Sequence, residues 1–131
     1  MRLTSKTRSI VAVSDADKTT TEPSFSVSYS DNLRYGDTPN GDLVGELEGD
    51  TPVTLVPAID NDIRDRLVEQ IVLLNRDTVS HTITVSKKDG STSYAIAKAT
   101  LGAGEALVYD GKGWDTFAAT GERKVLNVTT P

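Results

Sequence analysis

Cysteine is absent from this chain of 131 residues, and histidine occurs once, at His81. The lack of cysteine excludes a disulfide framework, thiolate metal sites and thiol catalysis. One histidine excludes the two-histidine zinc motifs. A Ser-His-Asp triad would have to use His81, but the chain has no Gly-x-Ser-x-Gly elbow. We therefore predict no catalytic residues, no metal site and no cofactor, and a protein that is not an enzyme.

Clusters of basic residues and long apolar runs are missing as well. The net charge is −5, and the largest basic groups are the pairs Lys87-Lys88 and Arg123-Lys124, both beside predicted turns. Affinity for nucleic acid depends on clustered Lys and Arg that release counterions. The first apolar run, residues 10–13, is too short for a signal peptide or a membrane span. We expect neither nucleic acid nor a membrane as a partner.

Aromatic residues are few, with one Trp, two Phe and four Tyr. Ser, Thr, Val, Gly and Asp are abundant instead, which is typical of an all-β domain with a modest aliphatic core. Trp114 follows the turn sequence Asp-Gly-Lys-Gly and is expected to fill the core at the end of a sheet rather than to serve as a ligand platform. The length is that of one ordinary domain.

The clearest strand pattern lies in residues 70–119. Residues 79–86 alternate, which predicts that Val79, His81, Ile83 and Val85 share a buried face and that the imidazole is partly buried with its hydrogen bonds satisfied. Residues 87–91 supply an Asp-Gly hairpin turn, because glycine accepts the positive φ that such turns need. Residues 92–101 return, and further strands are predicted at 106–109 and from Trp114. The apolar run at 71–74 belongs to the strand predicted at 67–75.

The other segments extend this pattern. Strands are predicted at residues 9–13, 24–30, 42–47, 53–56, 67–75 and 124–128, and polar loops at 15–23 and 31–40. Residues 58–66 are either a single helical turn or the charged entrance to a strand. The fold prediction is all-β, an antiparallel β-sandwich or jelly roll of about ten short strands with an extended N-terminal arm. Residues 1–23 form the N-terminal strand and polar arm, and 24–131 a single sandwich domain.

Residues 60–65 begin like a calcium loop, with oxygen ligands at alternate positions. The sixth position lacks glycine and the twelfth position is Ile71 rather than an acid, so we predict no metal there.

A recurring order of features resembles small virion structural proteins of tailed bacteriophages. Its elements are a strand-ending Asn, an alternating Thr-Val strand, an Asp-Gly turn, Leu-x-x-Gly-Glu-x-Leu-x-Tyr, Gly-Trp and a last Gly-x-x-Lys. The residues that carry it are Asn75, Thr82 to Val85, Asp89, Gly90, Leu101, Gly104, Glu105, Leu107, Tyr109, Gly113, Trp114 and Gly121 to Val125. The opening Leu3-Thr4-Ser5 followed by Ile10-Val11 is similar too.

This resemblance implies a β-sandwich building block of a phage particle, located in the virion and in the host cytoplasm before assembly. It implies a capsid decoration (cement) or minor capsid protein that binds the major capsid protein or other virion proteins. The protein is expected to be a homo-oligomer, with a trimer as the first expectation. The alternatives are a neck or tail component and a carbohydrate- or receptor-binding module. Candidate partner-binding residues lie in segments that the core pattern leaves unexplained: Arg2, Lys6, Arg8, Lys18, Glu22, Leu33, Arg34 and Tyr35.

Overall fold

The computed structural model describes residues 1–36 and 40–124 of the chain. These residues form ten β-strands and no helix. The strands are β1 (Arg2–Leu3), β2 (Arg8–Ser14), β3 (Ser24–Leu33), β4 (Asn40–Glu46), β5 (Val53–Val56), β6 (Ile63–Leu74), β7 (His81–Asp89), β8 (Thr92–Leu101), β9 (Ala106–Tyr109) and β10 (Trp114–Phe117).

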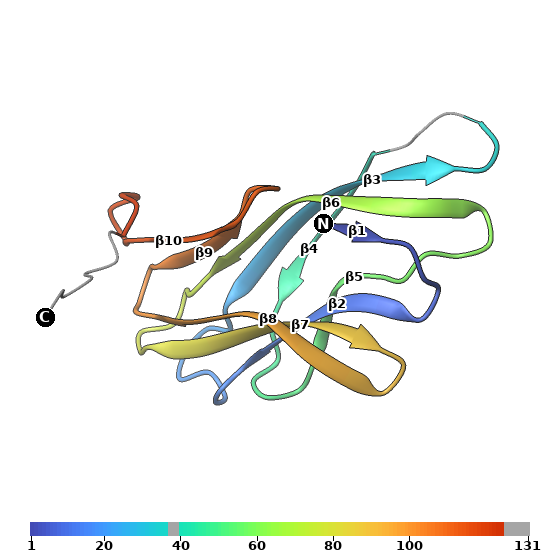
Figure 1. The fold of residues 1–131 in the computed structure, drawn as a ribbon. Helices are drawn as coiled ribbons and strands as arrows, with labels where there is room; N and C mark the ends of the chain where they lie inside the picture. The colour runs from blue at the N-terminus through green and yellow to red at the C-terminus, as the bar shows by residue number, and fades with distance from the viewer. Residues whose placement is uncertain (37–39, 125–131) are drawn as a thin grey trace, which may run out of the picture.

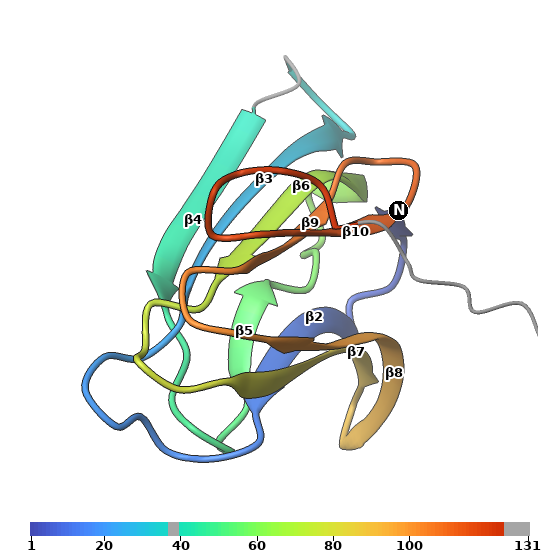
Figure 2. The same ribbon diagram turned by 90° about the vertical axis from the view of Figure 1, so that its left-hand side faces the viewer.

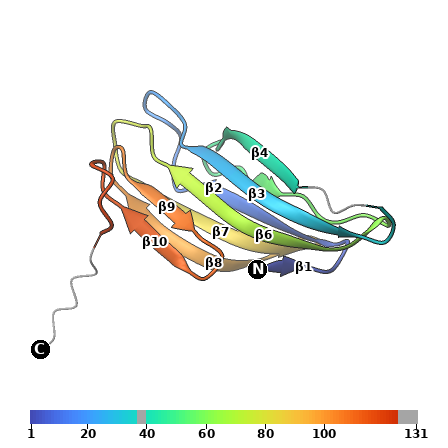
Figure 3. The ribbon, with the colours of Figure 1, turned by 90° about the horizontal axis from the view of Figure 1, so that it is seen from above.

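The strands make two antiparallel sheets that pack face to face (Figures 1 and 2). Sheet A has the order β10-β9-β6-β3-β4, and β1 pairs with β6 beside this path. Sheet B has the order β5-β2-β7-β8. Seen from above, the strands of the two sheets run in roughly the same direction (Figure 3). The arrangement confirms the predicted β-sandwich, while the jelly-roll alternative stays a prediction.

The core lies between the sheets and is filled by the inward side of each alternating strand. Ile83 and Val85 of β7 are fully buried, as are Ile71 and Leu73 of β6. β2 is a central strand of sheet B, and its residues Ile10 and Ala12 have no exposed surface. Burial of such aliphatic side chains is the main favourable contribution to folding. The first 23 residues therefore contribute a central strand to the sandwich.

Two glycines of β4 face aromatic rings of β3. Gly41 pairs with Tyr29, and Gly45 pairs with Phe25. A Cβ atom on Gly45 would lie 2.9 Å from Cζ of Phe25, and one on Gly41 would collide with the Tyr29 ring. Each ring covers the glycine opposite it, so the inward face of this edge strand is closed by side chains from its neighbour.

Several predicted boundaries prove wrong. Residues 31–33 belong to β3 and are not a loop. Of the two alternatives for residues 58–66, the charged entrance to a strand is confirmed, because β6 begins at Ile63. Lys87 and Lys88 lie in β7, so the turn is confined to Gly90 and Ser91. Val79 precedes β7 and is 42% exposed, so it does not share the buried face of His81. Of the strand predicted at residues 124–128, all but Lys124 lies outside the described residues.

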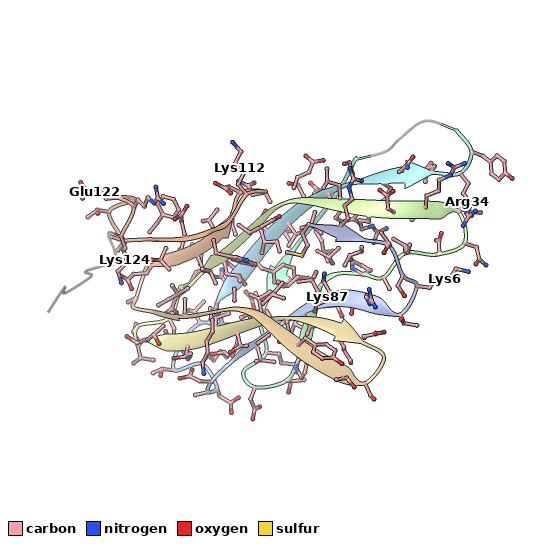
Figure 4. All side chains as sticks on the ribbon, viewed as in Figure 1. Lys6, Arg34, Lys87, Lys112, Glu122 and Lys124 are labelled. Atoms are coloured by element: carbon pink, nitrogen blue, oxygen red, sulfur yellow. The ribbon has the colours of Figure 1, made fainter. Side chains whose placement is uncertain are left out.

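Because neighbouring strands run antiparallel, the connections gather at two ends of the sandwich. The β1–β2 end carries the connections after β1, β3, β5 and β7. The β2–β3 end carries those after β2, β4, β6 and β8. Figure 4 shows Lys6 and Arg34 at the β1–β2 end and Glu122 and Lys124 toward the opposite end. The two ends present different chemistry, as described next.

Candidate functional site

The only histidine lies in a buried polar cluster at the β2–β3 end. Its Nε2 atom is 2.7 Å from Oδ2 of Asp77, and its Nδ1 atom is 2.9 Å from Oγ of Ser14 and 3.3 Å from Oδ1 of Asp15. His81 and Ser14 are each 1% exposed and Asp77 is 2% exposed. The prediction of a satisfied imidazole is confirmed, but the side chain is fully rather than partly buried.

The carboxylate of Asp77 also organises the loop between β2 and β3. It accepts hydrogen bonds from the backbone amides of Thr19, at 2.7 Å, and Thr20, at 2.9 Å. The hydrogen bond from His81 and the Thr19 amide hold the pKa of the Asp77 carboxyl far below its ordinary range. Burial lowers the pKa of His81, but hydrogen bonds to Asp77 and Asp15 outweigh it, so the pKa is raised. Both shifts favour an imidazolium–carboxylate pair.

Ser14, His81 and Asp77 contain the residue types of a nucleophilic triad, but their surroundings do not match that chemistry. A triad needs a serine hydroxyl that substrate can reach and amide donors free to bind an oxyanion. Ser14 is 1% exposed, its amide donates to the Gly49 carbonyl at 2.8 Å, and the next amide, of Asp15, donates to the Thr82 carbonyl at 3.0 Å. The cluster therefore acts as a structural junction between β2, β7 and the loop at residues 15–23.

Asn75 is a second buried polar residue at this end, and the sequence pattern identified it only as a strand breaker. Its side-chain amide donates to the carbonyls of Leu101 at 2.8 Å, Val79 at 2.9 Å and Gly102 at 3.2 Å. Its side-chain oxygen accepts from the amide of Asp77 at 3.0 Å. Asn75 thus holds the chain where it leaves sheet A for sheet B. Within the described residues, every buried side-chain polar atom has a hydrogen-bond partner.

The second candidate functional site is the surface at the β1–β2 end, which we call the β1–β2 surface. It consists of the turn at residues 4–7, residues 33–36, the connection at 57–62 and the turn at 90–91. Side chains and backbone link these segments. Lys6 donates to the Asn61 side chain, and the amide of Arg34 donates to the Asp62 carbonyl at 3.0 Å. The amide of Gly90 donates to the Thr7 carbonyl at 3.0 Å. Four connections distant in sequence thus hold one another in place.

A buried ion pair lies beneath this surface. Arg66 of β6 donates to both carboxylate oxygens of Asp31 in β3, at 2.7 and 3.1 Å, and both side chains are 9% exposed. Arg66 also donates to the Pro57 carbonyl at 2.7 Å and lies over the Tyr29 ring, 4.3 Å from its centroid. The guanidinium therefore fixes the start of the connection between β5 and β6.

Most predicted partner-binding residues lie toward the β1–β2 end. Arg2 forms an ion pair with Asp65 at 2.8 Å, and Arg8 forms one with Asp89 at 3.5 Å. Among the described residues, Tyr35 is the most exposed of the large hydrophobic side chains, at 85%. The predicted residues on or beside the β1–β2 surface are Arg2, Lys6, Arg8, Leu33, Arg34 and Tyr35.

Lys18 and Glu22 lie instead in the loop at the β2–β3 end. The amide of Lys18 donates to Oε1 of Glu22 at 3.2 Å, and Oε2 of Glu22 accepts from the amide of Gly49 at 3.0 Å. The Glu22 carboxylate is thus occupied by backbone amides of its own end. The structure does not bring Lys18 and Glu22 together with the other candidates.

Trp114 is half-buried and packs on the core. Its ring lies 5.2 Å from that of Tyr109 with an interplanar angle of 44°, a tilted arrangement that aromatic pairs favour. It contacts the cluster of buried core residues. The predicted contact of Trp114 with the core is confirmed, but the ring packs against the edge of the core and is partly exposed rather than filling it.

No group of three or more His, Asp or Glu side chains in residues 1–36 and 40–124 could hold a metal ion. The described chain also contains no helix long and apolar enough to cross a membrane. Comparisons of the sequence with protein-family models, and of the chain with curated proteins and solved structures, give no match.

Proposed function

We propose that the protein is a non-enzymatic structural component of a bacteriophage particle, a capsid decoration or minor capsid protein that binds the assembled shell through the β1–β2 surface. The observation behind this proposal is that Tyr35 is 85% exposed on a surface whose segments are joined to one another by hydrogen bonds. The chain would enter the virion from the host cytoplasm and bind the major capsid protein.

The chemistry of this surface supports a protein partner. Tyr and Arg are the residue types that most often dominate the free energy of protein–protein binding, and Arg34 and Tyr35 are adjacent and exposed. Loops already held by mutual hydrogen bonds lose less conformational entropy on binding than free loops do. Binding only to the assembled shell would stabilise it by mass action. The burial of Ser14 in the His81 cluster supports a role without catalysis.

The experiment uses empty shells of the phage that encodes the protein, prepared with and without it. Shells that carry the protein should melt several degrees higher, and binding should be measured by co-sedimentation. Arg34→Ala and Tyr35→Ala should each weaken binding, on the order of tenfold or more. Lys112→Ala, on the turn between β9 and β10, is the matched control and should bind normally.

Identical melting of decorated and bare shells would remove the cement role. Equal binding of the Tyr35→Ala variant and wild type would remove the β1–β2 surface as the contact. Binding to purified tails or necks in place of heads would move the protein to that part of the particle, and binding to glycans would favour the receptor-binding alternative.

A further inference from the structure

Each sheet ends in two strands that have a neighbour on one side only. In the described part of the chain these are β10 and β4 in sheet A and β5 and β8 in sheet B, and β4 and β8 are the longer strand of each pair. β4 has seven residues and β8 has ten. The outer edge of such a strand offers unpaired N–H and C=O groups to any extended segment that approaches it. Both edges are long enough to add a further strand.

The two edges carry charges of opposite sign. The charged residues of β4 are Asp42 and Glu46, both acidic and exposed, and Glu46 already forms an ion pair with Arg76 at 2.6 Å. The one charged residue of β8 is Lys98, and the neighbouring strand β7 has Lys87, Lys88 and, at its end, Asp89, which forms an ion pair with Arg8 at 3.5 Å. Like charges directly opposite each other destabilise a strand pair, and opposite charges stabilise it. The pattern opposes pairing of β4 with β4, or β8 with β8, and favours pairing of β4 with β8.

Both edges also expose apolar side chains. Val44 of β4 is 70% exposed, and Tyr94 of β8 is 61% exposed. Beside β8, Tyr94 and Ile96 form the apolar wall of an open cavity of about 290 Å³, whose other walls are Arg8, Lys87 and Asp89. Apolar groups with polar rims are typical of protein contacts.

We propose that copies of this chain associate edge to edge, with β4 of one copy pairing with β8 of the next. β4 and β8 lie on opposite sides of the sandwich (Figures 2 and 3), so each copy uses two different surfaces. Such a heterologous contact closes into a ring or extends as a filament. The inference deepens the proposed assembly role and rests on it for the choice of a closed ring, with three copies as the first expectation.

Self-association is tested on the free protein by sedimentation velocity over micromolar to millimolar concentration. Wild type should form a discrete species larger than a dimer. Asp42→Lys and Lys98→Glu should each weaken association, on the order of tenfold, because one attraction becomes a repulsion. The double variant restores opposite charges and should recover association. Lys112→Glu, the same charge change away from both edges, should behave as wild type.

Cross-linking identifies the strands in contact, since the chain has no cysteine of its own. The Val44→Cys, Ala95→Cys double variant, treated with a bismaleimide, should give a ladder of covalent oligomers. Each single variant should give no covalent oligomers, because its cysteine would lie against a neighbouring edge that carries no cysteine. A wild type that stays monomeric, charge variants without effect, or a dimer from Val44→Cys alone would overturn the proposal. These measurements contain no shells, so their failure and a failure of shell binding are distinguishable.

Discussion

Replacing Asp31 by Ala removes one half of the ion pair beneath the β1–β2 surface. The Arg66 guanidinium would keep only its hydrogen bond to the Pro57 carbonyl and its cation–π contact with the Tyr29 ring. Because the Arg66 side chain is only 9% exposed, water does not readily replace the lost carboxylate. Asp31→Ala therefore leaves a buried charge without its counter-ion, and we expect a large loss of folding free energy.

Breaking a buried pair by removing one partner costs about 3–5 kcal/mol. That is a substantial part of the total stability of a domain, which is about 5–15 kcal/mol. For a chain of this size the same loss corresponds to a decrease in Tm of roughly 10–20 °C. Burial lowers the pKa of Arg66, but hydrogen bonds and charge from Asp31 outweigh it and raise the pKa, so the variant loses the interaction that favours the charged form.

The assay is urea denaturation followed by the fluorescence of Trp114, the single tryptophan. Asp65→Ala is the matched control, because Asp65 lies next to Arg66 on β6 and pairs at 2.8 Å with Arg2, whose side chain is 59% exposed. An exposed pair contributes about 0–1 kcal/mol. The double variant Asp31→Leu, Arg66→Met should recover most of the stability. Equal losses for Asp31→Ala and Asp65→Ala would refute the reasoning.

Three further predictions use the same denaturation assay. The pKa of His81 is raised in the folded protein. Its contribution to stability is therefore complete below the pKa of about 6.5 in the unfolded chain and is lost as pH rises through the folded pKa. His81→Gln should remove this part of the pH dependence of stability, and an unchanged pH profile would contradict the prediction. Gly41→Ala should cost about 1–3 kcal/mol by collision with the Tyr29 ring, whereas Gly113→Ala, with open space, should cost little. Asn75→Ala should cost about 3 kcal/mol or more, because several buried backbone groups lose their partner; a loss below about 1 kcal/mol would show that they are satisfied otherwise.

Elements marked by local patterns were predictable from the sequence. The bounds of β5, β8 and β9 are those predicted, and β10 begins at Trp114 as predicted. In each case alternation or an apolar run ends at glycine or another turn-forming residue, and both signals act over a few neighbouring residues. The sandwich class followed from the number of such segments.

Features that depend on distant partners were not predictable. β6 begins at Ile63 because Arg66 occupies a buried position, where its charge is balanced by Asp31, 35 residues away. β1 has two residues and is therefore too short to show the alternating pattern of a strand. Ser14 and His81 are 67 residues apart, so nothing local indicated that they touch. Likewise, four separate turns had to be placed in space before the β1–β2 surface could be recognised.

The central position of β6 has a consequence for synthesis of the chain. β6 pairs with β1 and β3, which precede it, and with β9, which follows it. As the chain leaves the ribosome, β1 has no strand partner until β6 emerges, and residues 71–74 of β6 lack the partner on one side until residues 106–109 emerge. Long-range pairing of this kind slows folding. A nascent or prematurely terminated chain would therefore expose an aliphatic strand, the form most prone to aggregate.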